Sequence, residues 1–499
     1  MSVDLRGAPV LVVGAGIMGA GIAQVAAQAG LRVFLFDVRD GAAADAKARL
    51  AATFDGLVAK GRVEPHAAHA TLARIEVVTS LHAAASSGLV VEAIIEQLEA
   101  KRGLFRELER LLGEDAVLAT NTSSISITAI ANGLAAPQRL VGMHFFNPVP
   151  LMKLVEVVSG LQTAPAVADA IFELSKAWGK TPVHAKSTPG FIVNRIARPY
   201  YAEALALLQE QAAAPHEIDA CLKAAGFRMG PCELMDLIGH DTNFAVTNSV
   251  YEANFYDKRY MPSLVQREMV DGGLLGRKSG RGFYRYPEGA PALDVPRPAA
   301  PRAAARLVVH GRGPIAARLA EAAAGATRDE SSEWVGLSVD EARLVLGDGR
   351  SAGELGAAWG LADVAVFDRF DPGPADAPRA LAYALAEGAS ETWAHDAAAW
   401  LGVLGALPLR IADVPGLVVA RTIGMLINEA ADAVNQGVCS AEGADAAMKL
   451  GVNYPRGPFE WLAGWSAAEV VALLDTLDAH HRGERYRASP WLQRRAYAR

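Results

Sequence analysis

A glycine-rich turn between a short apolar segment and a helix-periodic one constrains the fold of this chain most strongly. The apolar segment PVLVV covers residues 9–13, and the turn that follows contains Gly14, Gly16 and Gly19 in the pattern G-x-G-x-x-G. With a second apolar segment at residues 31–37, this order predicts a strand, a tight turn, a helix and a parallel strand. In such a unit the three glycines allow the turn, admit a pyrophosphate and let the helix pack closely on the sheet.

Asp37 stands at the end of the predicted second strand. A carboxylate there can accept hydrogen bonds from a ribose, and it repels the 2′-phosphate of NADP. The sequence therefore favours NAD as the cofactor, while Arg39, two residues later, keeps NADP open as an alternative. A structural glycine turn with an ordinary acid at a strand end is the other interpretation.

The rest of the first 187 residues alternates between predicted strands and helices. Further strands are expected at residues 74–79, 88–94, 116–121 and 139–146. Parallel strands need crossover connections, so this alternation predicts a Rossmann-type, mainly parallel and doubly wound α/β sheet over residues 1–187.

The pattern becomes helical after Ser187 and stays so to residue 286. Thr188 and Pro189 are expected to be the N-cap and first residue of a long helix. A segment with repeated prolines follows at residues 287–303 and is predicted to be a linker, because proline prevents regular pairing.

The first helical segment is repeated near the end of the chain, which predicts a second helical domain at residues 412–499. Five matched positions carry the repeat: Pro189, Gly190, Arg195, Glu203 and Asp219 recur as Pro415, Gly416, Arg421, Glu429 and Asp445. Between the copies, residues 304–411 read as a degenerate Rossmann-like segment. Its turn at residues 311–314 lacks the third glycine and contains a proline, so no cofactor is expected there.

His144 and Glu156 are the candidates for acid–base chemistry. His144 ends a predicted strand, where the ligand crevice of an open α/β sheet lies, and Glu156 sits in an apolar run where a carboxylate needs a partner. A carboxylate that holds one imidazole nitrogen would fix its tautomer and raise its basicity. A structural histidine with a capped ring is the competing interpretation.

Composition and charge argue against other classes of protein. The net charge of the 499 residues is −7 without a long basic block, which disfavours nucleic-acid binding. Cys221, Cys232 and Cys439 form no CxxC pair and are expected to be free thiols in a reducing cytoplasm, with no metal site. We expect no secretion signal at the N-terminus and no membrane span.

Six segments of the chain resemble the 3-hydroxyacyl-CoA dehydrogenase family, in the family's order and across residues 9–286. They are VVGAGIMGAGIAQVAAQAG, VVEAIIEQLEAK, NTSSISIT, GMHFFNPVPLMKLVEVV, TPGFIVNRI and GRKSGRGFYRY. The second helical copy also resembles the C-terminal domain of that family. The resemblance implies NAD-dependent oxidation of an (S)-3-hydroxyacyl-CoA to a 3-oxoacyl-CoA. It favours 3-hydroxyadipyl-CoA in phenylacetate breakdown, with 3-hydroxybutyryl-CoA as the alternative.

The resemblance also implies the catalytic residues. His144 would be the general base in oxidation, and Glu156 would orient and polarise it. Ser123 would bond the 3-oxygen of the substrate and the cofactor, and Asn194 would contact the substrate. Ser123 as a helix cap and Asn194 as a polar surface residue are the alternatives. A non-enzymatic NAD-binding protein would have lost His144, Glu156 or Ser123, and all three are present.

Further residues would bind the cofactor if the resemblance holds. Asn147 would hold the nicotinamide side, Asn121 would lie close to it, and Glu96, Lys101 and Lys278 would contact the ribose region. Each has a simpler interpretation: Asn121 as a helix cap, Glu96 and Lys101 as a solvated helix face, and Lys278 as part of a surface turn.

The repeat separates structural residues from functional ones. Arg195 and Glu203 recur in a copy without catalytic motifs, so they are interpreted as structural, whereas Asn194 becomes Ala420. We expect one active site per chain, and either a homo-oligomer or an intrachain pseudo-dimer of the two helical domains. Lys60 is a weak candidate for contact with CoA phosphates, and a solvated basic turn is as good an interpretation.

Overall fold

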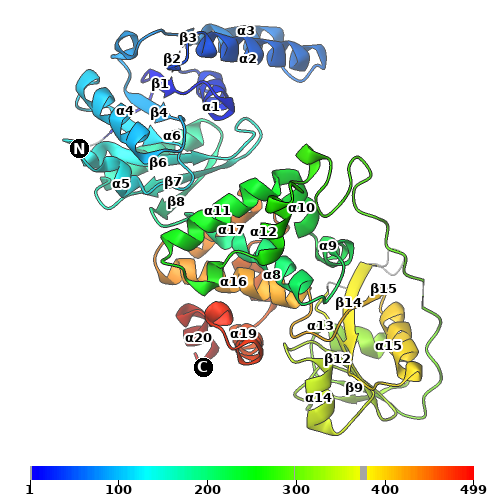
Figure 1. The fold of residues 1–499 in the computed structure, drawn as a ribbon. Coiled ribbons are helices and arrows are strands. Elements are labelled where there is room, and N and C mark those ends of the chain that lie inside the picture. The colour runs from blue at the N-terminus through cyan, green and yellow to red at the C-terminus, as the bar shows by residue number, and fades with distance from the viewer. Residues whose placement is uncertain (1–2, 297, 371–378, 499) are drawn as a thin grey trace. The chain divides into compact units, whose positions relative to one another are not determined.

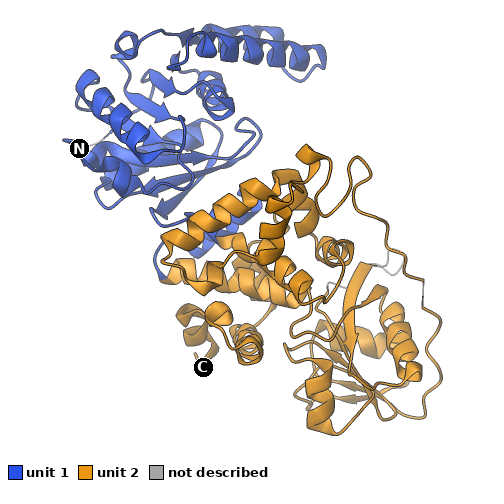
Figure 2. Ribbon diagram, viewed as in Figure 1, with its two compact units in different colours: residues 1–195, 436–452 blue, residues 196–435, 453–499 orange. Residues whose placement is uncertain are grey.

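The structure is a computed structural model of the 499-residue chain and describes residues 3–296, 298–370 and 379–498 (Figure 1). The chain divides into two compact units (Figure 2). The first contains residues 1–195 and 436–452, and the second contains residues 196–435 and 453–499. One short segment from near the end of the chain thus belongs to the N-terminal unit.

An eight-stranded sheet forms the centre of the first unit, with the order β3-β2-β1-β4-β5-β6-β7-β8. Its strands are β1 Val10–Val13, β2 Val33–Phe36, β3 Ile75–Val77, β4 Leu89–Glu92, β5 Val117–Thr120, β6 Leu140–Phe145, β7 Leu154–Ser159 and β8 Thr181–Lys186. Neighbouring strands are parallel except β6 and β7, which are antiparallel. The strand order reverses between β1 and β4, where an open α/β sheet forms its ligand crevice.

Helices cover this sheet, which is why β1, β4 and β5 are buried along their whole length. They are α1 Ile17–Gln28, α2 Ala42–Ala59, α3 Pro65–Ala73, α4 Leu98–Leu111, α5 Ile127–Ala131, α6 Pro165–Ala177 and, from the second sequence repeat, α17 Ala441–Gly451. α17 packs against β7 and β8, and the backbone N–H of Lys186 in β8 donates to the Val438 carbonyl at 2.9 Å. This contact covers the end of the outermost strand.

The predicted strands of this sheet are present, whereas the predicted start of the following helix is wrong. Thr188 is not an N-cap: residues 189–192 form turns, and helices follow only at α7 Val193–Ile196 and α8 Arg198–Gln209. Phe191 adopts a left-handed backbone with φ 47°, which an α-helix of L-residues cannot continue.

A seven-stranded mixed sheet occupies residues 307–410 of the second unit, with the order β10-β9-β11-β12-β13-β14-β15. Its elements are β9 Leu307–His310, α13 Pro314–Ala322, β10 Thr327–Asp329, β11 Gly336–Val339, β12 Ala342–Leu346, α14 Ala352–Trp359, β13 Val364–Phe367, β14 Arg379–Leu385, α15 Glu391–Val403 and β15 Ala406–Arg410. The antiparallel pairs β9–β11, β11–β12 and β13–β14 distinguish it from the first sheet and justify the term degenerate.

The remaining helices of the second unit come from both sequence repeats. The first copy supplies α8, α9 Pro215–Ala224, α10 Pro231–Ile238, α11 His240–Ala253 and α12 Leu264–Asp271, and the second supplies α16 Val419–Asn435, α18 Pro458–Gly464, α19 Ala467–His481 and α20 Pro490–Ala496. α8 packs against α16, whose residues 419–433 are all buried. Single 3₁₀ turns lie at Leu81–Ala84, Pro137–Arg139, Lys258–Tyr260, Arg277–Ser279 and Glu484–Tyr486.

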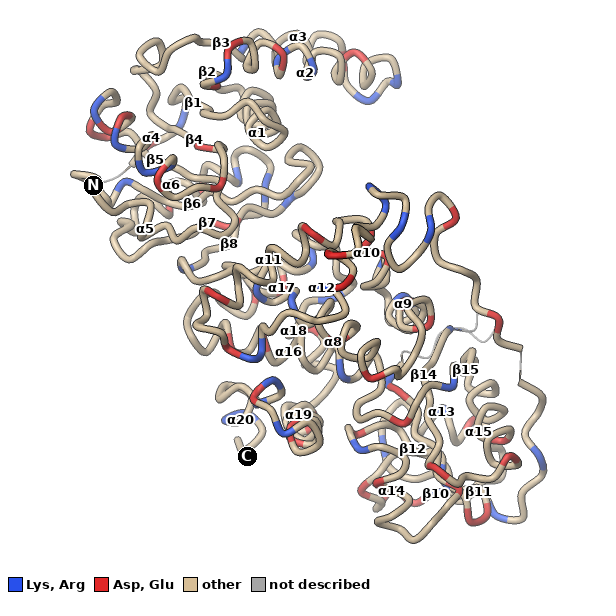
Figure 3. The backbone as a smooth tube through the Cα atoms, viewed as in Figure 1, with Lys and Arg blue, Asp and Glu red and all other residues tan. Residues whose placement is uncertain are grey.

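Acidic and basic side chains are interspersed along both units (Figure 3). Among the described residues, no helix is long and apolar enough to cross a membrane. The same part of the chain contains no group of three or more His, Cys, Asp or Glu side chains that could hold a metal ion.

Candidate active site

His144 and Glu156 are paired directly across the antiparallel strands β6 and β7. Side chains at such opposed positions point to the same face of the sheet and lie close together. The Nδ1 atom of His144 lies 2.5 Å from Oε2 of Glu156. The exposed fraction of His144 is 5%, and Glu156 is fully buried. The fold thus brings together the two residues that the sequence nominated for acid–base chemistry.

Both carboxylate oxygens of Glu156 accept hydrogen bonds. While Oε2 faces the imidazole, Oε1 accepts the backbone N–H groups of Ile192 at 3.0 Å and Val193 at 2.9 Å. These contacts satisfy a buried carboxylate and fix its orientation. Because the carboxylate accepts at Nδ1, the proton of a neutral His144 ring resides there. The Nε2 lone pair is then the one that can accept a proton from a ligand.

Aromatic rings surround the imidazole on two sides. The ring centroids of Phe146 and Phe191 lie 4.6 Å and 5.8 Å from that of His144. These apolar neighbours limit the water that can compete for the ring, which strengthens the hydrogen bond to Glu156.

The loop that carries Ser123 is held by a single carboxylate oxygen. Oε1 of Glu96 accepts the Thr122 hydroxyl at 2.5 Å, the Ser123 backbone N–H at 3.0 Å, and both the backbone N–H and the hydroxyl of Ser124, at 3.1 Å and 2.9 Å. The hydroxyl of Ser123 itself makes no hydrogen bond within the described chain. The network therefore fixes the backbone of Ser123 and leaves its side chain available for a ligand.

A buried ion-pair network lies behind Glu96, and sequence reasoning missed one of its members, Glu92. Nζ of Lys101 lies 2.6 Å from Oε1 of Glu92 and 3.2 Å from Oε2 of Glu96, and Lys101 is 1% exposed. Glu92 also accepts the Thr120 hydroxyl at 2.6 Å. A charged residue in the apolar run GLVVEAI was the signal, because a buried carboxylate needs a cation.

The charges of this network affect the ionisation of Glu96. Burial by itself would raise the pKa of the Glu96 carboxyl. The Lys101 ammonium and the hydroxyls of Thr122 and Ser124 outweigh burial, so the pKa lies below its usual value. Glu96 is therefore an anion at neutral pH and keeps its acceptor oxygens for the Ser123 loop.

The glycine turn leaves the start of α1 open to an anion. Gly14 has φ 102°, and a Cβ there would overlap the carbonyl of Ala93, whereas a Cβ at Gly16 would meet only open space. A Cβ at Gly19 would overlap the Gly14 carbonyl. No side chain caps the helix at Gly16, so its first N–H groups are available to a pyrophosphate. These residues fit the dinucleotide that the sequence predicted.

Asp37 lies beside the same turn. Its Oδ2 accepts the Ala15 N–H at 2.7 Å, and its Oδ1 lies 3.1 Å from Nε of Arg39, whose side chain is largely exposed. Burial by itself would raise the pKa of Asp37. The Arg39 guanidinium and the backbone N–H groups of Ala15 and Arg39 lower it by more, so the pKa lies below its usual value. Asp37 is thus an anion at neutral pH.

The other predicted contact residues lie in varied surroundings. Asn121 is partly buried, and its Oδ1 accepts the Phe145 N–H at 2.8 Å, which ties the ends of β5 and β6 together. Asn147 is exposed just after β6, and Asn194 is partly buried in α7. Lys60 is exposed at the end of α2.

Lys278 belongs to the second unit. Its ammonium lies 2.5 Å from Oδ1 of Asp241, and both side chains are nearly half exposed. It is therefore held in a surface ion pair rather than in a buried network.

The fold and site define an NAD-dependent oxidoreductase of the Rossmann class with a histidine–carboxylate pair. Two family descriptions match most of the chain: the 3-hydroxyacyl-CoA dehydrogenase NAD binding domain at residues 9–188, and the C-terminal domain of the same family at residues 190–286 and 416–499. The chain belongs to the 3-hydroxyacyl-CoA dehydrogenase family. Residues 344–415 match the 3-hydroxybutyryl-CoA dehydrogenase reduced Rossmann-fold domain.

The known relatives cover either nearly the whole chain or a little more than half of it. A 3-hydroxyadipyl-CoA dehydrogenase of Escherichia coli K12 is 43% identical over 98% of this chain and 97% of its own length. A crystal structure of 3-hydroxybutyryl-CoA dehydrogenase from E. coli K12 has a TM-score of 0.89 and 41% identity, covering 99% and 98% of the two chains. The human mitochondrial hydroxyacyl-coenzyme A dehydrogenase is 41% identical over 56% of this chain and 90% of its own length.

These findings confirm the predicted family, the fold class and NAD as the cofactor. Because the members of this family are NAD-dependent oxidoreductases, the findings also favour an enzyme over the alternative of a non-enzymatic NAD-binding protein.

Proposed function

We propose that this enzyme oxidises the 3-hydroxyl group of 3-hydroxyadipyl-CoA in the breakdown of phenylacetate. The buried His144–Glu156 pair is the observation that carries the acid–base part of the proposal. The substrate follows the E. coli relative that matches the chain over nearly its full length. 3-Hydroxybutyryl-CoA is the second candidate, because the similar solved structure bears that substrate's name.

In this mechanism Nε2 of His144 takes the proton of the substrate hydroxyl as the C3–H bond breaks. Bound NAD supplies the acceptor for the hydride. Glu156 holds the Nδ1–H and stabilises the imidazolium that forms, and the same ring returns the proton in the reverse direction. The proton and hydride leave together as a two-electron oxidation, which gives the 3-oxoacyl-CoA.

Ser123 and Asn194 position the substrate in this proposal. The Ser123 hydroxyl donates to the 3-oxygen, and the Glu96 contacts keep the Ser123 backbone in one conformation. Asn194 adds a polar contact from α7. A substrate oxygen fixed in this way presents its proton to His144 in a reactive geometry.

The cofactor contacts are proposed on the same basis. The start of α1 at Gly16 binds the pyrophosphate, and Asp37 accepts from the adenosine ribose. Asn147 and Asn121 lie on the nicotinamide side, and Glu96, with Lys101 behind it, faces the second ribose. The weaker candidates are Lys278 for the cofactor and Lys60 for the CoA phosphates.

NADH absorbance on mixing the full chain, NAD and each CoA ester tests the proposal. We expect a higher kcat/KM for 3-hydroxyadipyl-CoA than for 3-hydroxybutyryl-CoA. Replacing His144 with alanine should lower kcat by about 10²–10⁴-fold while NAD binding persists. Near-normal turnover of His144→Ala would show that His144 is not the general base. A higher kcat/KM for 3-hydroxybutyryl-CoA would favour the second candidate substrate.

We also propose that the two helical copies form an intrachain pair that takes the place of a homodimer contact. Glu203 of the first copy accepts from Arg421 at 2.7 Å, Arg485 at 2.9 Å and Tyr486 at 2.9 Å, all from the second copy. Glu429 of the second copy accepts the Tyr260 hydroxyl of the first at 2.6 Å.

This reciprocity is typical of an isologous contact. Light scattering on the intact enzyme should give the mass of a monomer, and a stable dimer would contradict the proposal.

A cytoplasmic location is part of the proposal as well. Cys221, Cys232 and Cys439 are free thiols, which suits a reducing compartment.

A further inference from the structure

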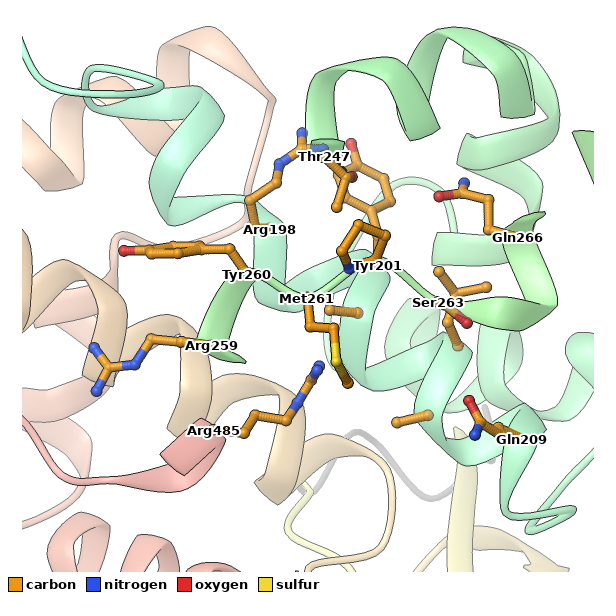
Figure 4. A pocket seen from close by; sticks show the side chains of 14 residues that line it. Arg198, Tyr201, Gln209, Thr247, Arg259, Tyr260, Met261, Ser263, Gln266 and Arg485 are labelled. Atoms are coloured by element: carbon orange, nitrogen blue, oxygen red, sulfur yellow. Dashed lines mark hydrogen bonds between the residues drawn. The ribbon is translucent and has the colours of Figure 1, made fainter. Parts of the chain in front are cut away.

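The second helical copy is divided between the two units. In the second unit α16 packs against α8 of the first copy, and Arg259 of the first copy and Arg485 of the second line the same cavity (Figure 4). Among the described helices of this copy α17 is the exception, because residues 436–452 belong to the first unit. A segment of the copy without catalytic motifs therefore packs on the sheet that carries His144 and Glu156.

The C-terminal end of α17 approaches this sheet closely at Gly451, which is buried. A Cβ at Gly451 would lie 2.7 Å from Cδ2 of Leu154 and 3.0 Å from Cγ2 of Val193. It would also contact Cε1 of Phe146 at 3.7 Å. Non-bonded carbon atoms prefer separations of about 3.5–4.0 Å, so the space here is too small for a side chain. The glycine lets α17 pack against these three residues.

Two of these neighbours contact the His144–Glu156 pair. The ring centroid of Phe146 lies 4.6 Å from that of His144. The backbone N–H of Val193 donates to Oε1 of Glu156 at 2.9 Å. Gly451 therefore packs against a neighbour of each member of the pair, an aromatic ring for the imidazole and a hydrogen-bond donor for the carboxylate.

The same segment holds the chain around Val193 through a second contact. Arg195, two residues later, is 3% exposed and donates from Nη1 to Oε1 of Gln436 at 2.8 Å. The start of α7 thus contacts Glu156 and the segment 436–452 at the same time. Because its N–H groups fix the Glu156 carboxylate, a shift of this part of the chain would also move the carboxylate.

This crossing of helices recurs in the other half of the chain. α9, which matches α17 in the sequence repeat, packs against β14 of the seven-stranded sheet. Each helical copy thus supplies the corresponding helix to the sheet of the other half. The crossing itself belongs to the structure that both halves share, whereas its contact with the surroundings of a histidine–carboxylate pair is a feature of the first unit.

We propose that Gly451 is a positioning residue for the oxidation, acting through Val193 and Phe146 on the His144–Glu156 pair. The inference rests on the proposed function, in which His144 is the general base. The second helical copy then contributes to turnover by supporting the base rather than by touching the substrate. Because proton transfer requires close alignment of the reacting atoms, a displaced base loses rate, while the binding of NAD to the glycine turn is unaffected.

Substitutions at Gly451 test the proposal, and Gly443 in the same helix is the matched control. Gly451→Val should lower kcat by about tenfold or more, since a misplacement of about 1 Å can cost about 10²-fold, while the KM for NAD stays near its wild-type value. Gly451→Ala should give a smaller loss, and it serves where the valine variant does not fold. The nearest atom to a Cβ at Gly443 would be the Ser440 hydroxyl at 3.3 Å, so Gly443→Ala should leave kcat unchanged.

A wild-type kcat in both Gly451 variants would overturn the proposal, even if their unfolding temperature fell, because Gly451 would then serve only the fold. An equal loss of kcat in Gly443→Ala would overturn it as well, since the effect would not depend on the contact with Val193 and Phe146.

The proton between His144 and Glu156 gives a readout that does not depend on turnover. In the proton NMR spectrum of the full-length enzyme, the Nδ1–H signal is the low-field resonance that His144→Ala removes. Gly451→Ala should shift or broaden this signal, Gly443→Ala should leave it in place, and an unchanged signal in Gly451→Ala would contradict the proposal. If the wild type oxidises neither CoA ester, the proposed function fails, whereas a shifted signal still shows that Gly451 positions the imidazole.

Discussion

Two carboxylates, one in each unit, hold the corresponding turn of the two sequence repeats. In the first unit Glu156 accepts the N–H groups of Ile192 and Val193. In the second unit Asp368 accepts those of residues 418–420, at 2.9 Å, 2.6 Å and 2.9 Å. The matched residues before these N–H groups, Phe191 and Leu417, have left-handed φ values of 47° and 48°.

Glu156 and Asp368 differ in the partners that their carboxylate oxygens have besides the N–H groups of this turn. Oε2 of Glu156 faces an imidazole, whereas Oδ1 of Asp368 accepts the backbone N–H of Arg369 as well as that of Ala420. A carboxylate that fixes this turn is thus a structural device that both copies share. Catalysis in the first unit adds a histidine to a carboxylate that is already held in place.

Replacing the two carboxylates by amides should give the largest contrast. Glu156→Gln presents an amide to Nδ1 of His144, which favours the wrong tautomer, so we expect kcat to fall by about 10³–10⁴-fold. Asp368→Asn should keep kcat within about twofold, which is less than about 0.5 kcal/mol. NADH formation measures both. Equal losses would mean that Glu156 acts on turnover only through the fold.

The pH dependence of stability should separate the two carboxylates further. Burial of Asp368 raises its pKa from 3.8 to about 6, although backbone N–H groups oppose the shift. The folded state therefore binds the proton more tightly than the unfolded chain. The stability from Asp368 is fully present below pH 3.8 and is lost as the pH rises through about 6.

The gap between the two pKa values corresponds to roughly 3 kcal/mol. Denaturant unfolding from pH 4 to 7.5 should show Asp368→Asn losing more stability, relative to the wild type, at pH 4 than at pH 7.5. Parallel curves for the two proteins would contradict the assignment.

Asn194 provides a smaller test, because the second copy has Ala420 at its position. Asn194→Ala should lower kcat/KM by about tenfold, as expected for the loss of one hydrogen bond in the transition state, with NAD affinity unchanged. The unfolding temperature serves as the control for folding. If Asn194→Ala kept the wild-type kcat/KM, Asn194 would have no role in binding the substrate.

Lys278 should give the smallest effect. Its ion pair with Asp241 is nearly half exposed, so Lys278→Met should change the free energy of unfolding by less than about 1 kcal/mol. A rise of a few fold in the KM for NAD is expected if Lys278 contacts the cofactor. An unchanged KM for NAD would mean that Lys278 serves only in the surface ion pair with Asp241.

Local patterns predicted much of the first unit. The glycine turn, Asp37 and the strands that end near Asn121 and His144 follow from periodicity and turn chemistry, since buried parallel strands are continuous apolar runs. The partnership of His144 and Glu156 was also foreseeable, because an acid in an apolar run needs a partner.

Other features depend on tertiary structure that no local pattern contains. Glu92 and Lys101 meet only after β4 and α4 have packed together, and the left-handed Phe191 breaks a helix that the sequence favoured. The repeat places α17 in the second helical copy, and only the tertiary structure shows that α17 packs on β7 and β8 of the first sheet. These outcomes are decided by contacts between segments distant in sequence.

The position of α17 has a consequence for biosynthesis. β8, the outermost strand of the eight-stranded sheet, has been synthesised once translation reaches residue 186. The segment that bonds to β8 and packs on β7 and β8 lies much later, at residues 436–452. An uncovered edge strand is open to pairing with other chains. During translation at about 5–20 residues per second, this edge waits some 13–50 seconds for its cover. During that interval the nascent polypeptide presents an edge strand that can pair with other chains.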